Sequence, residues 1–166
     1  MTQTGTIADL IDLSIAIERI TESVYSHFVV IFADVPEIAT FWRRYAQEET
    51  GHANWMRNLR GRVDPLILAQ PADAKIWEMA VHATRVSAEQ LVVQIETLQD
   101  AFELANEIEH GETNAIFEFL MRNFSNDEKS VMFLRTQLKD HIGHLMNGLP
   151  DPYREISARR AVRARQ

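Results

Sequence analysis

Hydrophobic residues recur every three or four positions along most of the chain, which is the spacing of one face of an α-helix. The first such pattern covers residues 7–33 and the second covers residues 36–60. Asp34-Val35-Pro36 interrupts them, and Pro36 suits the first turn of the second helix because proline lacks the N–H group that has no helical partner there. The short connection predicts that these two helices form an antiparallel hairpin.

The middle of the chain is less regular. Residues 61–72 contain two proline breaks and predict a linker, and residues 73–96 predict a helical crossover that can divide into two shorter helices. A third helical pattern spans residues 97–122. Ser125-Asn126-Asp127-Glu128 has the spacing of a capping box and opens a fourth pattern over residues 126–147. These patterns predict an all-α protein of two hairpins joined by a long crossover, in contrast to a simple up-down-up-down bundle.

A motif of potential metal ligands occurs once in each half of the chain. Each copy has a glutamate near the middle of one helical pattern and two ligand-type residues, three positions apart, on the next pattern. Residues at positions i and i+3 share one face of a helix, so each pair can direct two side chains to one point. Four helices that do this together form a binuclear metal site. The first copy is Glu18 with Glu49 and His52, and the second is Glu109 with His141 and His144.

A structural interpretation also fits each member of this motif taken alone. Glu18 lies among Ile, Val, Tyr and Phe, where an ionised carboxylate is strongly destabilising unless another charge compensates it. It can instead lie at the polar edge of this stripe, and a Glu-x-x-His pair such as Glu49 with His52 is common on exposed helix faces. The joint pattern on four helices favours the metal site over a purely structural bundle.

On these residues the chain resembles the rubrerythrin and bacterioferritin branch of the ferritin-like superfamily, over roughly residues 7–148. The resemblance implies a ferritin-like four-helix bundle of two antiparallel helical hairpins joined by a long, partly helical crossover. It also implies two bound iron ions, with manganese and zinc as alternatives. By this resemblance Glu18 is a terminal ligand of one metal, Glu49 bridges the two metals, His52 binds the first, and Glu109 and His144 bind the second.

One position departs from the family pattern, which has Glu-x-x-His on the fourth helix. This chain has His141 where the family has its bridging glutamate, so the site has one carboxylate fewer. Glu112, one turn beyond Glu109, can restore that carboxylate, and rubrerythrins carry a second glutamate at this spacing. Asp140 is the other candidate, although it is short and points about 100° away from His141. The additional nitrogen ligands favour Fe, Cu, Ni or Zn over Mn.

Tyr25 is the candidate catalytic residue, because it follows Glu18 on the same helix face and can hydrogen-bond a ligand or supply an electron. Packing in the core is the alternative role. The resemblance implies a non-haem di-iron oxidoreductase that oxidises Fe²⁺ or reduces O₂ or peroxide. Ferritin-type iron storage and a non-catalytic metal-binding or structural bundle are the alternatives. Rubrerythrins often carry a Cys₄ rubredoxin domain, and this chain has no Cys, so a peroxidase of this type needs an external electron donor.

The composition agrees with a single globular domain, which we assign to residues 1–152. The chain has 166 residues, of which 46% are hydrophobic and 25% are charged, and it has no Cys for disulfides or thiolate metal sites. The N-terminus lacks a signal-peptide pattern, and no apolar stretch reaches the roughly 20 residues of a membrane span. We therefore expect a cytoplasmic protein without membrane contact. We also expect a homo-oligomer, in the simplest case a dimer.

The charge is distributed unevenly along the chain. Residues 153–166 contain five arginines and one glutamate, a net +4, which leaves −11 for the rest of a chain whose formal net charge is −7. An acidic body disfavours nucleic acid as a ligand and favours cations near the surface. We interpret the basic tail as a solvated terminal segment, with binding of an anion as the alternative.

Overall fold

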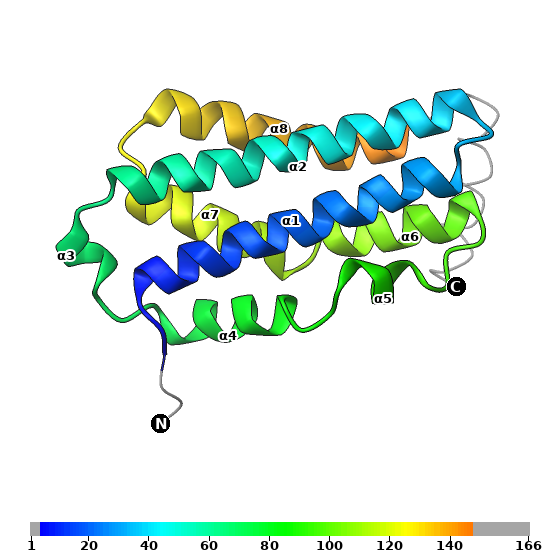
Figure 1. Ribbon diagram of the computed structural model, residues 1–166. Coiled ribbons are helices and arrows are strands. Elements are labelled where there is room, and N and C mark those ends of the chain that lie inside the picture. Colours follow the sequence, from blue (N-terminus) through cyan, green and yellow to red (C-terminus); the bar gives the residue numbers. More distant parts are fainter. Residues whose placement is uncertain (1–3, 148–166) are drawn as a thin grey trace, which may run out of the picture.

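The computed structural model describes residues 4–147, apart from the side chains of residue 112 and residues 141–147. Within this range every regular element is a helix, and an isolated antiparallel bridge joins Thr6 to Pro71 (Figure 1). The predicted all-α class is therefore confirmed for the described part of the chain. None of the helices found there combines the length and the hydropathy needed to cross a bilayer.

Helices α1 (Ile7–Ile31) and α2 (Pro36–Arg62) run antiparallel beside one another (Figure 1). Helix α1 begins at a capping box: the Thr6 hydroxyl accepts from the backbone N–H of Asp9 at 3.2 Å, and the Asp9 carboxylate accepts from the backbone N–H of Thr6 at 2.8 Å. Helix α2 begins with Pro36 as its first residue. Both helices end within two residues of the predicted positions.

Three short helices connect α2 to the second half of the chain: α3 (Pro65–Leu68), α4 (Ala74–Ala83) and α5 (Ala88–Val92). All three pack against α1. Helix α5 begins at a capping box, because the Ser87 hydroxyl accepts from the backbone N–H of Gln90 and the Gln90 side chain accepts from the backbone N–H of Ser87. The predicted crossover is thus helical in two pieces, and the predicted linker contains one further helical turn.

The single third helix predicted over residues 97–122 is wrong. The chain forms α6 (Leu98–Glu109) and α7 (Glu112–Phe124), which are separated by His110 and Gly111. Gly111 approaches the end of α6 so closely that a Cβ atom there would lie 2.9 Å from the carbonyl oxygen of Glu107. The side-chain amide of Asn114 reaches back and donates to the carbonyl oxygen of Glu109. Consequently, Glu109 is the last residue of α6 and Glu112 is the first residue of α7. Helix α8 (Glu128–Asn147) follows.

A polar layer divides the interior into two apolar clusters. The first cluster is formed by the N-terminal half of α1, the C-terminal half of α2, α7 and buried residues of α4 and α8. The second is formed by the opposite halves of α1 and α2 with α5 and α6. Buried polar residues occur on α1, α2 and α6 between the positions that supply the two clusters. The first cluster includes Leu10, Ile11, Met56, Phe117 and Leu120. The second cluster includes Tyr25, Phe28, Trp42, Tyr45 and Phe102. The polar layer between them contains Glu18, Thr21, Glu49, His52 and Glu109.

We expect Gly111→Ala to destabilise the fold by roughly 1–3 kcal/mol, because the new methyl group meets backbone carbonyl oxygens of α6 that cannot move independently. Gly51→Ala is the matched control. It lies within α2, is exposed, and has no heavy atom within 4 Å of the Cβ position, so it should stabilise by roughly 0.5–1 kcal/mol. Urea unfolding followed by circular dichroism measures both changes. Equal stabilities of the two variants would contradict the close approach at Gly111.

Candidate metal centre

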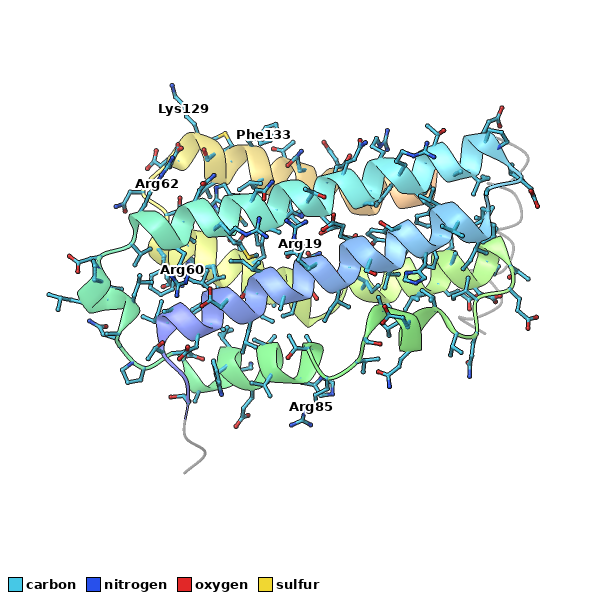
Figure 2. All side chains as sticks on the ribbon, viewed as in Figure 1. Arg19, Arg60, Arg62, Arg85, Lys129 and Phe133 are labelled. Carbon is cyan, nitrogen blue, oxygen red and sulfur yellow. The ribbon has the colours of Figure 1, made fainter. Side chains whose placement is uncertain are left out.

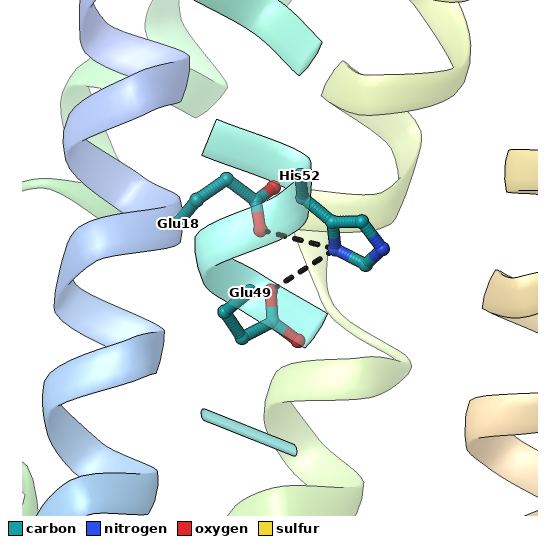
Figure 3. Close-up of side chains that lie close together, drawn as sticks. All are labelled: Glu18, Glu49 and His52. Carbon is teal, nitrogen blue, oxygen red and sulfur yellow. Dashed lines mark hydrogen bonds and ion pairs between the residues drawn. The ribbon is translucent and has the colours of Figure 1, made fainter. Parts of the chain in front are cut away.

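Glu18, Glu49 and His52 form a compact buried triad in the polar layer (Figure 3). Each residue offers one potential ligand atom, and these three atoms all lie within 4.8 Å of one another. The Nδ1 atom of His52 is 3.2 Å from Glu49 Oε2 and 3.5 Å from Glu18 Oε2. The exposed fractions are 3% for each glutamate and 2% for the histidine, so the triad is closed to bulk water.

The local geometry of α1 and α2 explains why these side chains meet. Glu49 and His52 are three residues apart on α2 and therefore share one face of that helix. Glu18 comes from the facing helix α1. The register of the two helices is fixed beside the triad, because the Thr50 hydroxyl on α2 donates to Glu22 on α1 at 2.7 Å.

Burial and mutual repulsion determine the charges in the triad. Burial raises the pKa of Glu49 well above 4.5, and the negative charge of Glu18 raises it further. Burial by itself would lower the pKa of His52, but hydrogen bonds to Glu18 and Glu49 outweigh burial and raise that pKa from 6.5 to about 10. In the metal-free protein at neutral pH, His52 is therefore a cation that lies between two carboxyl groups.

Tyr25 bonds Glu109 and is also subject to the charge of Glu49. Its hydroxyl donates to Glu109 Oε1 at 2.6 Å, across from α1 to α6, and both residues are buried. Burial is the largest cause that raises the pKa of Tyr25 well above 10. The negative charge of Glu109, and then that of Glu49, raise this pKa further. Because two carboxylates on different helices act on one phenol, Tyr25 lies between the triad and Glu109 and stays protonated as a hydrogen-bond donor.

The second copy of the motif is only partly placed. Glu109 is 4% exposed and bonded to Tyr25, and among the side chains that the structure describes it does not belong to the group whose ligand atoms meet within 4.8 Å. Glu112 is the first residue of α7, and His141 and His144 lie on α8, but their side chains are outside the described residues. The structure thus brings together the first three predicted ligands, while the remaining four stay predictions as ligands.

Tyr45 is a residue near the site that the sequence did not identify as functional. Burial raises the pKa of its hydroxyl, and the negative charge of Glu109 raises that pKa further. Its ring contacts that of Tyr25 edge-on, with 5.4 Å between the centroids. The available signal was its position one helical turn before Glu49 on the inward face of α2. The charge of Glu109 therefore acts on tyrosines of both α1 and α2.

Comparison of the chain with protein-family models, curated proteins and solved structures finds no match. The functional interpretation of the site therefore depends on its own geometry and chemistry.

We expect the metal-free protein to lose stability as the pH rises from 6.5 to 10. The folded pKa of His52 is about 10 against 6.5 for the free side chain, so its contribution is complete below pH 6.5 and is lost by pH 10. Glu49 acts in the same direction, since its folded pKa is also raised. The loss should be roughly 3–5 kcal/mol.

Urea unfolding in the presence of chelator measures this dependence. His52→Gln should flatten the profile, whereas His82→Gln, an exposed histidine on α4, should leave the slope unchanged. A wild-type profile that is flat over this range would show that His52 is not held as a cation between the glutamates.

Proposed function

We propose that the chain is a ferritin-like protein whose buried carboxylate–histidine residues bind iron. In this proposal α1 and α2 are one hairpin of a four-helix bundle, α6–α7 and α8 are the other, and α3, α4 and α5 are the crossover between them. The directions of the long helices in Figure 1 and the packing of the short helices on α1 support this arrangement. The order of the elements is that of bundles with one long crossover connection.

The observation that carries the functional proposal is the convergence of Glu18, Glu49 and His52 in a layer closed to water. Two adjacent carboxylates in a protein interior are destabilising unless a cation compensates them. Carboxylate oxygen and imidazole nitrogen together suit first-row divalent metals. The donor set therefore fits Fe²⁺, and manganese or zinc can occupy the same ligands.

We assign the triad to the first iron ion. The second ion would take Glu109, with Glu112, His141 and His144 as its further ligands by resemblance to the rubrerythrin and bacterioferritin branch. Bound iron would supply redox chemistry toward Fe²⁺, O₂ or peroxide as substrates. With no Cys in the chain, electrons for peroxide reduction come from Fe²⁺ itself or from an external donor.

The chain's own residues prepare the site for a cation. The apolar clusters on both sides exclude water from the layer, which strengthens every charge interaction inside it. The proton that His52 shares with Glu18 and Glu49 must leave when a metal takes its place, so metal binding releases protons. Tyr25 positions Glu109 through its hydrogen bond and keeps that carboxylate turned into the layer.

A purely structural role is the second candidate, and one observation favours it. The protonated His52 already compensates the two glutamates at 3.2 and 3.5 Å, so an ion pair can hold the layer together without a metal. The two roles differ in their response to added metal, because only a metal site gains stability from it.

We expect protein purified without chelator to contain one to two transition-metal ions per chain, and Glu49→Gln to remove most of this metal. Added Fe²⁺ or Zn²⁺ should stabilise the wild type by about 2.7 kcal/mol at a hundred times the dissociation constant. Glu103→Gln, at an exposed position of α6, is the matched control and should bind as the wild type does. Identical thermal unfolding with and without metal would leave only the structural role.

We expect Tyr25→Phe to slow iron oxidation by about 10–100-fold, because it removes the donor that positions Glu109 while preserving the packing of the ring. The measurement is the rate of Fe²⁺ oxidation by O₂ and by peroxide, with the metal content determined in parallel. Glu103→Gln, at an exposed position of α6, is again the control that should not change the rate. Wild-type protein that binds iron but oxidises it no faster than buffer would exclude the oxidoreductase activity and leave metal binding.

A further inference from the structure

The buried triad is closed to bulk water, so a cation can reach it only where the protein opens. Apolar clusters lie beyond the polar layer toward both ends of α1 and α2. On the α7 side, the ring of Phe117 packs on that of His52 with 5.3 Å between centroids, and the ring of Trp55 packs on Phe117 at the same separation. These apolar walls disfavour the passage of a hydrated cation, because stripping its water there is very costly.

A polar contact lies at the seam between α1 and α2, beside the triad. Glu22 is on α1 one turn after Glu18, so the two glutamates share one side of that helix, with about 5–6 Å between their Cβ atoms. The hydroxyl of Thr50, the residue after Glu49, donates to Glu22 Oε1 at 2.7 Å. The side chain of Glu22 is 27% exposed, whereas that of Glu18 is 4% exposed. Glu22 therefore connects solvent to the side of α1 that carries Glu18.

Arg19 holds the second carboxylate oxygen of Glu22. Its guanidinium donates to Glu22 Oε2, three residues further along α1. The side chain of Arg19 is 36% exposed, so it can leave this pair without crossing the core. Figure 2 shows Arg19 at the middle of the seam, and Arg60, which pairs with Asp12 at 2.8 Å, nearer the start of α1. Both oxygens of Glu22 are thus engaged in the metal-free protein, one by Thr50 and one by a displaceable cation.

We propose that Glu22 is the entry residue of the triad, which takes up a divalent cation at the seam and passes it to Glu18. Arg19 covers the Glu22 carboxylate while no metal is there, because the guanidinium and the metal compete for the same oxygen. Thr50 keeps that carboxylate between the two helices. The inference rests on the proposed metal function and adds to it the route by which the ion arrives. A carboxylate in such a cleft attracts cations and raises the rate at which they bind.

Glu48 offers a rival route on the other side of α2. It lines a cavity of about 370 Å³ between α2 and α8, and it pairs with Arg44 at 3.6 Å. Trp55 lines the same cavity, and from Trp55 the way to His52 leads through the ring of Phe117. The route from Glu22 passes from one carboxylate to the next along α1. The lining of the two routes therefore selects Glu22 over Glu48 for a charged species.

Stopped-flow binding of Co²⁺ to the chelator-treated full chain, followed by visible absorption, tests the proposal, and equilibrium titration gives Kd separately. Glu22→Gln should slow association about tenfold and slow dissociation by the same factor, because an entry residue acts on passage in both directions. Its Kd should stay within about twofold of the wild type. The amide oxygen of glutamine can still accept from Thr50, so the variant keeps the contact between α1 and α2. Arg19→Gln should speed association by about three- to tenfold, again with an unchanged Kd.

Asp12→Asn is the matched control, because it removes the same charge from another arginine pair between α1 and α2. Glu48→Gln makes that change on the rival route. Both should keep the wild-type rate constants.

Rapid association of Glu22→Gln would overturn the proposal, and so would slow association that occurs in Glu48→Gln instead. A weaker Kd for Glu22→Gln with an unchanged association rate would make Glu22 a support of the bound ion and would also overturn it. These three outcomes leave metal binding intact. A wild-type chain that binds no Co²⁺ would overturn the metal function and this inference together.

Discussion

The structure depends on keeping Glu18 and Glu49 side by side in an interior closed to water. Apolar clusters lie on both sides of these carboxylates, so neither can reach solvent without separating α1 from α2. A proton or a cation must therefore compensate their charge, and His52 supplies a cation when it is protonated. The same requirement suits the layer to a divalent metal, which would replace the proton with a larger charge beside the same carboxylates.

The first half of the fold and the triad followed from the sequence because the relevant interactions are local. The helical period and the start signal at Pro36 predicted α2, and the spacing of Glu49 and His52 predicted their common face. The break at Gly111 was missed because the apolar period continues across it and a glycine within a helix costs only about 1 kcal/mol. Whether the chain bends there depends on the packing of α6 and α7 on other helices.

The spacing of residues in the sequence also could not predict the hydrogen-bond partner of Tyr25. Its position on the face of Glu18 predicted a role beside a ligand, but the carboxylate that it bonds lies 84 residues away on α6. That pairing depends on the rotation of α6 about its own axis, which no local signal encodes. The effect of Glu109 on Tyr45 has the same origin. Long-range polar contacts of this kind decide how the two halves of the layer are joined.

The break between α6 and α7 gives the two halves of the polar layer different mechanical properties. Glu18, Glu49 and His52 lie in the middle of long continuous helices, so each is held from both directions along its backbone. Glu109 is the last residue of α6 and is held from one direction only. Beyond Glu109 the backbone turns at His110 and Gly111, so the position of this carboxylate depends on the Tyr25 hydroxyl and on the Asn114 amide instead of on a continuing helix.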